Sequence, residues 1–177
     1  MKDIAVIFYS RTGTTKQAAE MLADQLDCPV FEVEDAKSRA GLWGDLRCVV
    51  DNILRRHVSY RYAGPDLSDY ESLVFMAPVW VGHLAAPMRS FLEDRRPFQR
   101  GVAAVAVMAA RGGFRAAEEI SSALGRPPHP VVVLLQRDIA NGEARHEIDA
   151  FATALLAESP KSPGVAPRPS WLSPHEA

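Results

Sequence analysis

The chain has few cysteines and no clustered metal ligands. Among its 177 residues are 2 cysteines, Cys28 and Cys48, which form neither a CxxC motif nor a Cys/His cluster. This excludes a small protein held together by disulfides or zinc. A single core at this length buries about 70% of the surface of an extended chain, so the fold needs no metal. We expect two free, buried thiols in a reducing cytosol.

Long apolar runs and an excess of one charge are also missing. The longest uncharged apolar run covers residues 102–110, whereas a bilayer span needs about 20 residues, so we expect no membrane span. The first residues, Met1-Lys2-Asp3, place an acid where a signal peptide has only bases, which favours a cytoplasmic protein. With 20 basic and 22 acidic residues, the chain has no overall field for a polyanion, so nucleic acid is not expected as a partner.

Five short apolar runs predict buried strands. They are uninterrupted by polar residues, which is typical of strands covered on both faces, and they span residues 4–9, 30–33, 73–77, 102–109 and 131–135. Apolar residues between and after these runs recur at helical spacing. This alternation predicts an α/β fold with a doubly wound, five-stranded parallel sheet between two layers of helices. Ligands of such sheets bind at the carboxyl ends of the strands.

Two segments depart from this alternation. Residues 36–64 carry six bases against two acids and include a predicted helix at 45–56. This basic insert is either a solvated helix face or a docking patch for an acidic partner or an anionic substrate. Residues 159–177 hold 5 of the 13 prolines, which predicts a flexible tail. We therefore expect one domain over residues 1–158.

The turn after the first predicted strand is rich in hydroxyl groups. Its sequence, Ser-Arg-Thr-Gly-Thr-Thr-Lys, spans residues 10–16. An anion is favoured at the start of a helix by unpaired N–H groups, to which hydroxyls add donors. Gly13 lets the backbone curl around a ligand, so a terminal phosphate suits this turn. The alternative is that Thr14 or Thr15 is only a helix N-cap.

Other phosphate sites do not match this turn. Neither GxGxxG, for a dinucleotide, nor GxxxxGK[ST], for a triphosphate, is present. A receiver domain would have an Asp where Ala77-Pro78 ends the third strand, and a small phosphatase would have a cysteine in the first loop. We therefore expect a bound phosphate to serve as a handle and not as the reacting group.

The loop after the third strand carries an indole at the sheet's carboxyl edge. Pro78 is expected to stop the strand and Gly82 to allow a tight turn. Trp80 either lines a flat aromatic ligand or closes the core beneath the next helix. His83 is either a loop residue without a role or a proton donor near a ring nitrogen.

The loop after the fourth strand combines glycines with an arginine and an aromatic residue. Gly112 and Gly113 leave backbone amides accessible to the edge of a ligand, and Phe114 could flank its plane. Arg111 could stabilise negative charge on a reduced ring or pair with a phosphate. The alternative for Arg111 is a solvated residue at the rim.

Two motifs resemble those of the flavodoxin-like family. Ser10, Thr12, Gly13 and Thr15 match a (Thr or Ser)-x-Thr-Gly-x-Thr phosphate signature, and residues 78–82 with Pro87 and Phe91-Leu92 are similar to a Pro-Val-Trp-x-Gly…Pro…Phe-Leu stretch. The resemblance covers about residues 3–156. It implies a sheet of order 2-1-3-4-5 and one non-covalent FMN. The implied cofactor-binding residues are Ser10, Arg11, Thr12, Gly13, Thr14, Thr15, Pro78, Val79, Trp80, Val81, Gly82, Ala110, Arg111, Gly112, Gly113 and Phe114.

The same resemblance implies redox chemistry carried by the flavin. We expect electron transfer, or an NAD(P)H-dependent oxidoreductase acting on a quinone-type or protein acceptor, with His83 and Arg111 as candidate catalytic residues. Small carrier flavodoxins surround the flavin with acids, but this chain has none over residues 76–91 or 108–117. The alternative is a binding or regulatory module, with structural flavin or none, that docks through residues 36–64. A homodimer is left open.

Overall fold

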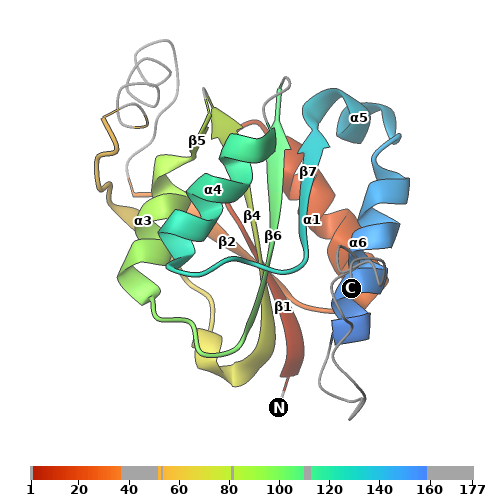
Figure 1. The fold of residues 1–177 in the computed structure, drawn as a ribbon, viewed down its shortest axis with the longest axis horizontal. Helices are drawn as coiled ribbons and strands as arrows, with labels where there is room; N and C mark the ends of the chain where they lie inside the picture. Colours follow the sequence, from red (N-terminus) through yellow and green to blue (C-terminus); the bar gives the residue numbers. More distant parts are fainter. Residues whose placement is uncertain (1, 37–51, 53, 81, 110–112, 159–177) are drawn as a thin grey trace, which may run out of the picture.

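Five parallel strands form the centre of the molecule, with helices on either side (Figure 1). The structure is a computed structural model that describes residues 2–36, 52, 54–80, 82–109 and 113–158. The strands lie in the order β2-β1-β4-β6-β7, which confirms the predicted order 2-1-3-4-5. Their bounds are β1 (Lys2–Phe8), β2 (Val30–Asp35), β4 (Tyr70–Trp80), β6 (Gly101–Met108) and β7 (Val131–Leu135).

Two short antiparallel strands correct the expectation of a five-stranded, wholly parallel sheet. β3 (Tyr60–Tyr62) pairs with β2 at the sheet's edge, and β5 (His83–Leu84) folds back on the end of β4. The sheet therefore has seven strands in the described part of the chain. Strands of two or three residues are too short to produce a periodic signal in the sequence.

Helices cover both faces of the sheet. α3 (Ala86–Arg95) and α4 (Gly113–Leu124) lie on one face, while α1 (Thr14–Leu26) and α6 (Arg145–Glu158) lie on the other (Figure 1). This confirms the predicted three layers. The short helix α5 (Gln136–Asn141) and the 3₁₀ turn at Leu67–Asp69 complete the described elements. Pro87 lies in the first turn of α3, where its missing N–H has no helical partner to lose.

The central strands are buried on both faces, as their uninterrupted apolar runs predict. Ile7 and Phe75 point into the core under α3 and α4, and Val6 and Val74 point into the core under α1 and α6. All four side chains are at most 2% exposed. Burying an aliphatic or aromatic side chain of this size contributes about 1.5–3 kcal/mol, so these strands provide much of the free energy that opposes chain entropy.

Pro78 does not end its strand, contrary to expectation. β4 continues to Trp80, and Pro78 pairs with Val107 of β6 in the ladder. The carbonyl oxygen of Pro78 accepts a hydrogen bond from the N–H of Ala85 at 3.0 Å. In a strand the N and O of one residue point to the same side. The missing N–H of proline therefore faces β5, away from β6, and no bond to β6 is lost.

Residues 52 and 54–58, which we call the strap, hold the end of the basic insert against α3. The Oδ1 of Asn52 accepts the N–H of Ala86 at 2.8 Å, and the Oγ of Ser90 accepts the N–H of Val58 at 2.9 Å. Arg89, only 1% exposed, donates to the carbonyls of Leu84 at 3.4 Å and Arg56 at 3.0 Å. The strap is thus fixed largely by polar contacts.

Much of the basic insert lies outside the described residues, including most of the predicted helix at 45–56. Its described end, residues 54–56, is not helical. Leu54 and Arg55 form a turn in which Arg55 adopts a left-handed φ of 49°. The predicted tail at 159–177 and Cys48 also lie outside the described part.

Cys28 is a free cysteine, as expected, but it is only partly buried. Burial and the adjacent carboxylate of Asp27 raise the pKa of the Cys28 thiol to about 11. Because the thiolate is the nucleophile, this thiol is protonated and unreactive near neutral pH. In the described ranges, no helix is both long and apolar enough to cross a bilayer.

Replacing Arg89 with alanine should destabilise the fold and release the strap. We expect Arg89→Ala to lower the free energy of unfolding by about 2–4 kcal/mol, because it removes charged hydrogen bonds from buried carbonyls and leaves a cavity. Urea denaturation measures this loss. The matched control is Arg137→Ala on α5, whose exposed side chain pairs with neighbouring Asp138 and should contribute little. Equal effects of the two substitutions would contradict the buried role of Arg89.

Candidate functional site

The carboxyl ends of the central strands bring the predicted loops to one edge of the sheet. β1, β4 and β6 run parallel, so the turn at residues 9–13, the β4–β5 hairpin and the end of β6 lie at the same end of the molecule (Figure 1). This is the edge at which ligands of doubly wound sheets bind. The first two loops identified from the sequence therefore lie at one edge, and the third, at residues 110–112, lies outside the described residues.

Gly13, and not a threonine, caps helix α1. Gly13 adopts a left-handed conformation with φ of 90°, and no side chain bonds to the open N–H groups of the helix. The interpretation of Thr14 or Thr15 as the N-cap is therefore wrong, because α1 begins at Thr14 and both threonines lie in its first turn. The first N–H groups of a helix have no partner within the helix. Gly13 has no side chain that could cap them.

Hydroxyl groups surround this helix end. The Oγ of Ser10 accepts the N–H of Gly13 at 3.1 Å, which leaves the serine proton free to be donated. The Oγ1 atoms of Thr12 and Thr14 are 3.5 Å apart, and Thr15 is 2% exposed. The first turn of α1 contains no acid. An anion at this position would therefore meet donors and no carboxylate from that turn.

Trp80 packs between the core and the carboxyl edge. Its ring centroid is 6.3 Å from that of Tyr9, with an angle of 75° between the ring planes. Trp80 is partly buried and packs against the core under α3 and α4. Its contact with a ligand stays a prediction. The hydroxyl of Tyr9 donates to Asp35 Oδ2 at 2.8 Å, which links the ends of β1 and β2.

The structure describes the remaining predicted residues unevenly. Pro78 and Val79 are buried in β4, and Gly82 turns the β4–β5 hairpin with φ of 80°. Gly113 and Phe114 begin α4. Val81, Ala110, Arg111 and Gly112 lie outside the described residues, so their predicted contacts stay predictions.

His83 faces a carboxylate that sequence reasoning missed. Its Nδ1 is 3.1 Å from Glu119 Oε1, and the same oxygen accepts a hydrogen bond from Arg55 at 2.5 Å. Residues 83 and 119 are 36 positions apart, so no local pattern could have paired them. Arg55, one of the six bases of the insert, is thus paired with Glu119.

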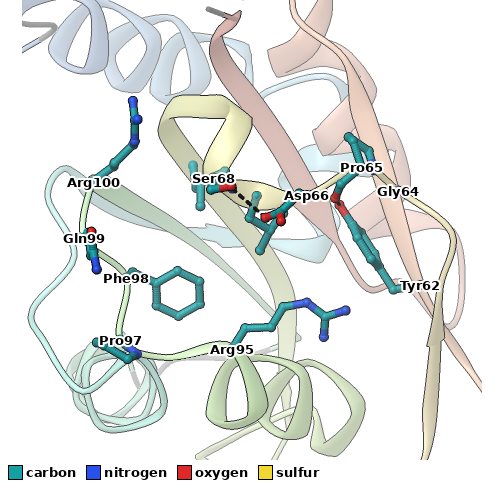
Figure 2. A pocket seen from close by; sticks show the side chains of 12 residues that line it. Tyr62, Gly64, Pro65, Asp66, Ser68, Arg95, Pro97, Phe98, Gln99 and Arg100 are labelled. Carbon is teal, nitrogen blue, oxygen red and sulfur yellow. Dashed lines mark hydrogen bonds between the residues drawn. The ribbon is translucent and has the colours of Figure 1, made fainter.

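A cavity of 620 Å³ lies elsewhere, at the amino end of β4 (Figure 2). The guanidinium of Arg95 at its wall lies 5.1 Å from the ring centre of Tyr62 and 4.2 Å from that of Phe91, and donates to the hydroxyl of Tyr60 at 2.6 Å. Burial raises the pKa of Tyr62 to about 12. These contacts clamp β3 to α3. The cavity is not part of the predicted loops.

Comparison with known proteins defines the fold. No family model and no curated protein sequence matches the chain. A flavoprotein in complex with FMN from Lactobacillus acidophilus NCFM is similar in structure, with a TM-score of 0.67 and 19% identity over 86% of this chain and 99% of that one. The apo form of the flavoprotein from the same organism gives 0.61 and 19%, over 76% and 92% of the two chains.

A third solved structure has the same topology. Oxidised flavodoxin 2 from Bacillus cereus has a TM-score of 0.58 and 15% identity, over 88% of this chain and 98% of that one. The chain therefore has a flavodoxin-like fold, as the motifs at residues 10–15 and 78–82 implied.

The bond between Tyr9 and Asp35 should stabilise the edge of the site. Tyr9→Phe removes the donor from a partly buried carboxylate, and we expect the free energy of unfolding to fall by about 1–2 kcal/mol. Thermal or urea unfolding measures this loss of stability. As a control, Tyr62→Phe removes a longer bond, 3.3 Å to the carbonyl of Pro65, and should cost less. A larger loss in the control would show that the Tyr9 bond does not stabilise this edge.

Proposed function

We propose that the chain binds FMN without a covalent link and acts in electron transfer. The observation that carries this proposal is the start of α1: a left-handed Gly13 leaves the first-turn N–H groups without a side-chain cap and among hydroxyls. This donor set suits a phosphate dianion, because both the N–H groups and the partial positive charge of a helix start favour an anion. The structural likeness to a flavoprotein in complex with FMN supports it.

Two groups of residues at the carboxyl edge would hold two parts of the ligand, the phosphate and the ring. Ser10, Thr12, Thr14 and Thr15 would hold the phosphate together with the backbone of α1. Trp80 and the segment before α4 would face the ring. When bound, the flavin supplies reversible one- and two-electron chemistry, and the chain supplies binding, orientation and control of access.

The first test is a binding experiment on the purified chain. We expect the fluorescence of added FMN to be quenched on binding, with a titration that fits one saturable site. The absorbance spectrum of the bound flavin should be shifted from that of free FMN. Riboflavin, which lacks the phosphate, is the matched control ligand and should bind at least tenfold more weakly. Equal affinity for FMN and riboflavin would argue against a phosphate site in this turn.

Gly13→Ala should weaken FMN binding in a way that its effect on stability does not explain. A side chain in the left-handed region costs about 1–2 kcal/mol, and the backbone must shift to relieve it. Gly142→Ala is the matched control: it also has positive φ, 77°, and like Gly13 has nothing within 4 Å of an added Cβ. Both variants should lose about 1 kcal/mol of stability, but Gly13→Ala alone should weaken FMN binding, by about tenfold. Equal FMN affinity in the two variants would contradict the assignment.

The electron donor separates two forms of the proposal. Rapid bleaching of the bound flavin by NADH or NADPH, followed by oxidation with a quinone, would support an oxidoreductase. A flavin that dithionite reduces but nicotinamide nucleotides do not would support a carrier fed by a protein partner. Stopped-flow absorbance under anaerobic conditions distinguishes them.

A further inference from the structure

A buried carboxylate stands beside the proposed ring site. Glu119 on α4 is 9% exposed. Its Oε1 lies 2.5 Å from Nη1 of Arg55 and 3.1 Å from Nδ1 of His83. Its Oε2 is buried without a hydrogen-bond partner. The three residues come from the strap, from β5 and from α4, so only the folded chain brings them together.

This cluster is an inefficient way to stabilise the fold. Burying a carboxylate is unfavourable, and an apolar side chain of similar size at such a position is often neutral or stabilising. One of the two oxygens of Glu119 is left unpaired, which adds to the cost. Groups held at such a cost are frequently found at functional sites.

The contact with Glu119 determines how His83 presents its ring. A carboxylate oxygen only accepts hydrogen bonds, so the Nδ1 that faces Glu119 carries a proton and donates. In the neutral ring, Nε2 is then the acceptor that can meet a ligand, and in the protonated ring Nε2 becomes a donor. A second group on one ring nitrogen commonly fixes the tautomer in this way.

His83 is also well placed along the chain. It pairs with Trp80 across the β4–β5 hairpin, and its side chain is 30% exposed. Trp80 in turn contacts Tyr9 at the end of β1. The imidazole therefore lies at the carboxyl edge of the sheet, beside the loops that converge there.

From these contacts we infer that His83 is a ligand-facing residue of this edge, and that Glu119, anchored by Arg55, is the positioning residue that orients it. The inference rests on the proposed function. The ligand it fits is the polar edge of a planar heteroaromatic ring, in which a ring nitrogen accepts a hydrogen bond in the oxidised state and donates one once the ring is reduced and protonated. An imidazole whose Nε2 can do either matches both states.

The test uses the full chain with ¹⁵N-labelled histidine, compared as wild type, Glu119→Gln and Glu118→Gln. Glu118 is the exposed neighbour on the same helix and is the matched control. Without FMN, the ¹⁵N shifts of the wild-type His83 ring should show a proton on Nδ1. Glu119→Gln should give a mixture of tautomers, whereas Glu118→Gln should leave the wild-type pattern. An unchanged His83 tautomer in Glu119→Gln would overturn the positioning role.

FMN is then added to the same samples. The His83 ring signals should move on binding, while those of His129, at the opposite end of the sheet, should not. We expect Glu119→Gln to weaken FMN binding about fivefold, which corresponds to the loss of one hydrogen bond of about 1 kcal/mol. FMN binding that quenches the flavin fluorescence but leaves the His83 ring signals unchanged would overturn this inference and leave the proposed function intact. No FMN binding at all would overturn both.

Discussion

Burial of the two central strands on both faces is the constraint on which the other features depend. Residues 4–8 of β1 and 73–79 of β4 are apolar throughout, and the helices on each side cover them. A polar group within these stretches would lose its water without gaining a partner. The polar groups of this edge therefore lie beyond the strand ends, in the turn after β1 and in the β4–β5 hairpin.

The strap also stabilises this edge, through contacts with the two helices on one face of the sheet. Asn52, Val58 and the carbonyl of Arg56 bond to α3, and Arg55 reaches α4. The basic insert is thus more than a charged surface: its described end ties together the two helices that flank the β4–β5 hairpin. The described residues at this end contribute through specific hydrogen bonds and through the ion pair of Arg55 with Glu119.

Sequence reasoning predicted what repeats along the chain and missed what joins distant residues. Continuous apolar runs identified the five parallel strands, and a glycine among hydroxyls identified the turn at Gly13. Composition could not decide whether Gly13 or a threonine caps α1, because that depends on one backbone angle. Tyr9 with Asp35, and His83 with Glu119, are 26 and 36 positions apart. Such pairs depend on which strands and helices are neighbours in the fold, and the periodicity of the sequence does not reveal those neighbours.

The shortness of β3 limits how the edge of the sheet can pair with a strand from another copy of the chain. β3 is an edge strand of three residues with exposed Arg61 at its centre, paired to Glu34 of β2. A strand from another molecule would find few free backbone groups there and would have to bury a guanidinium. β3, which belongs to the insert, therefore leaves only a short, charged edge beside the carboxyl half of β2.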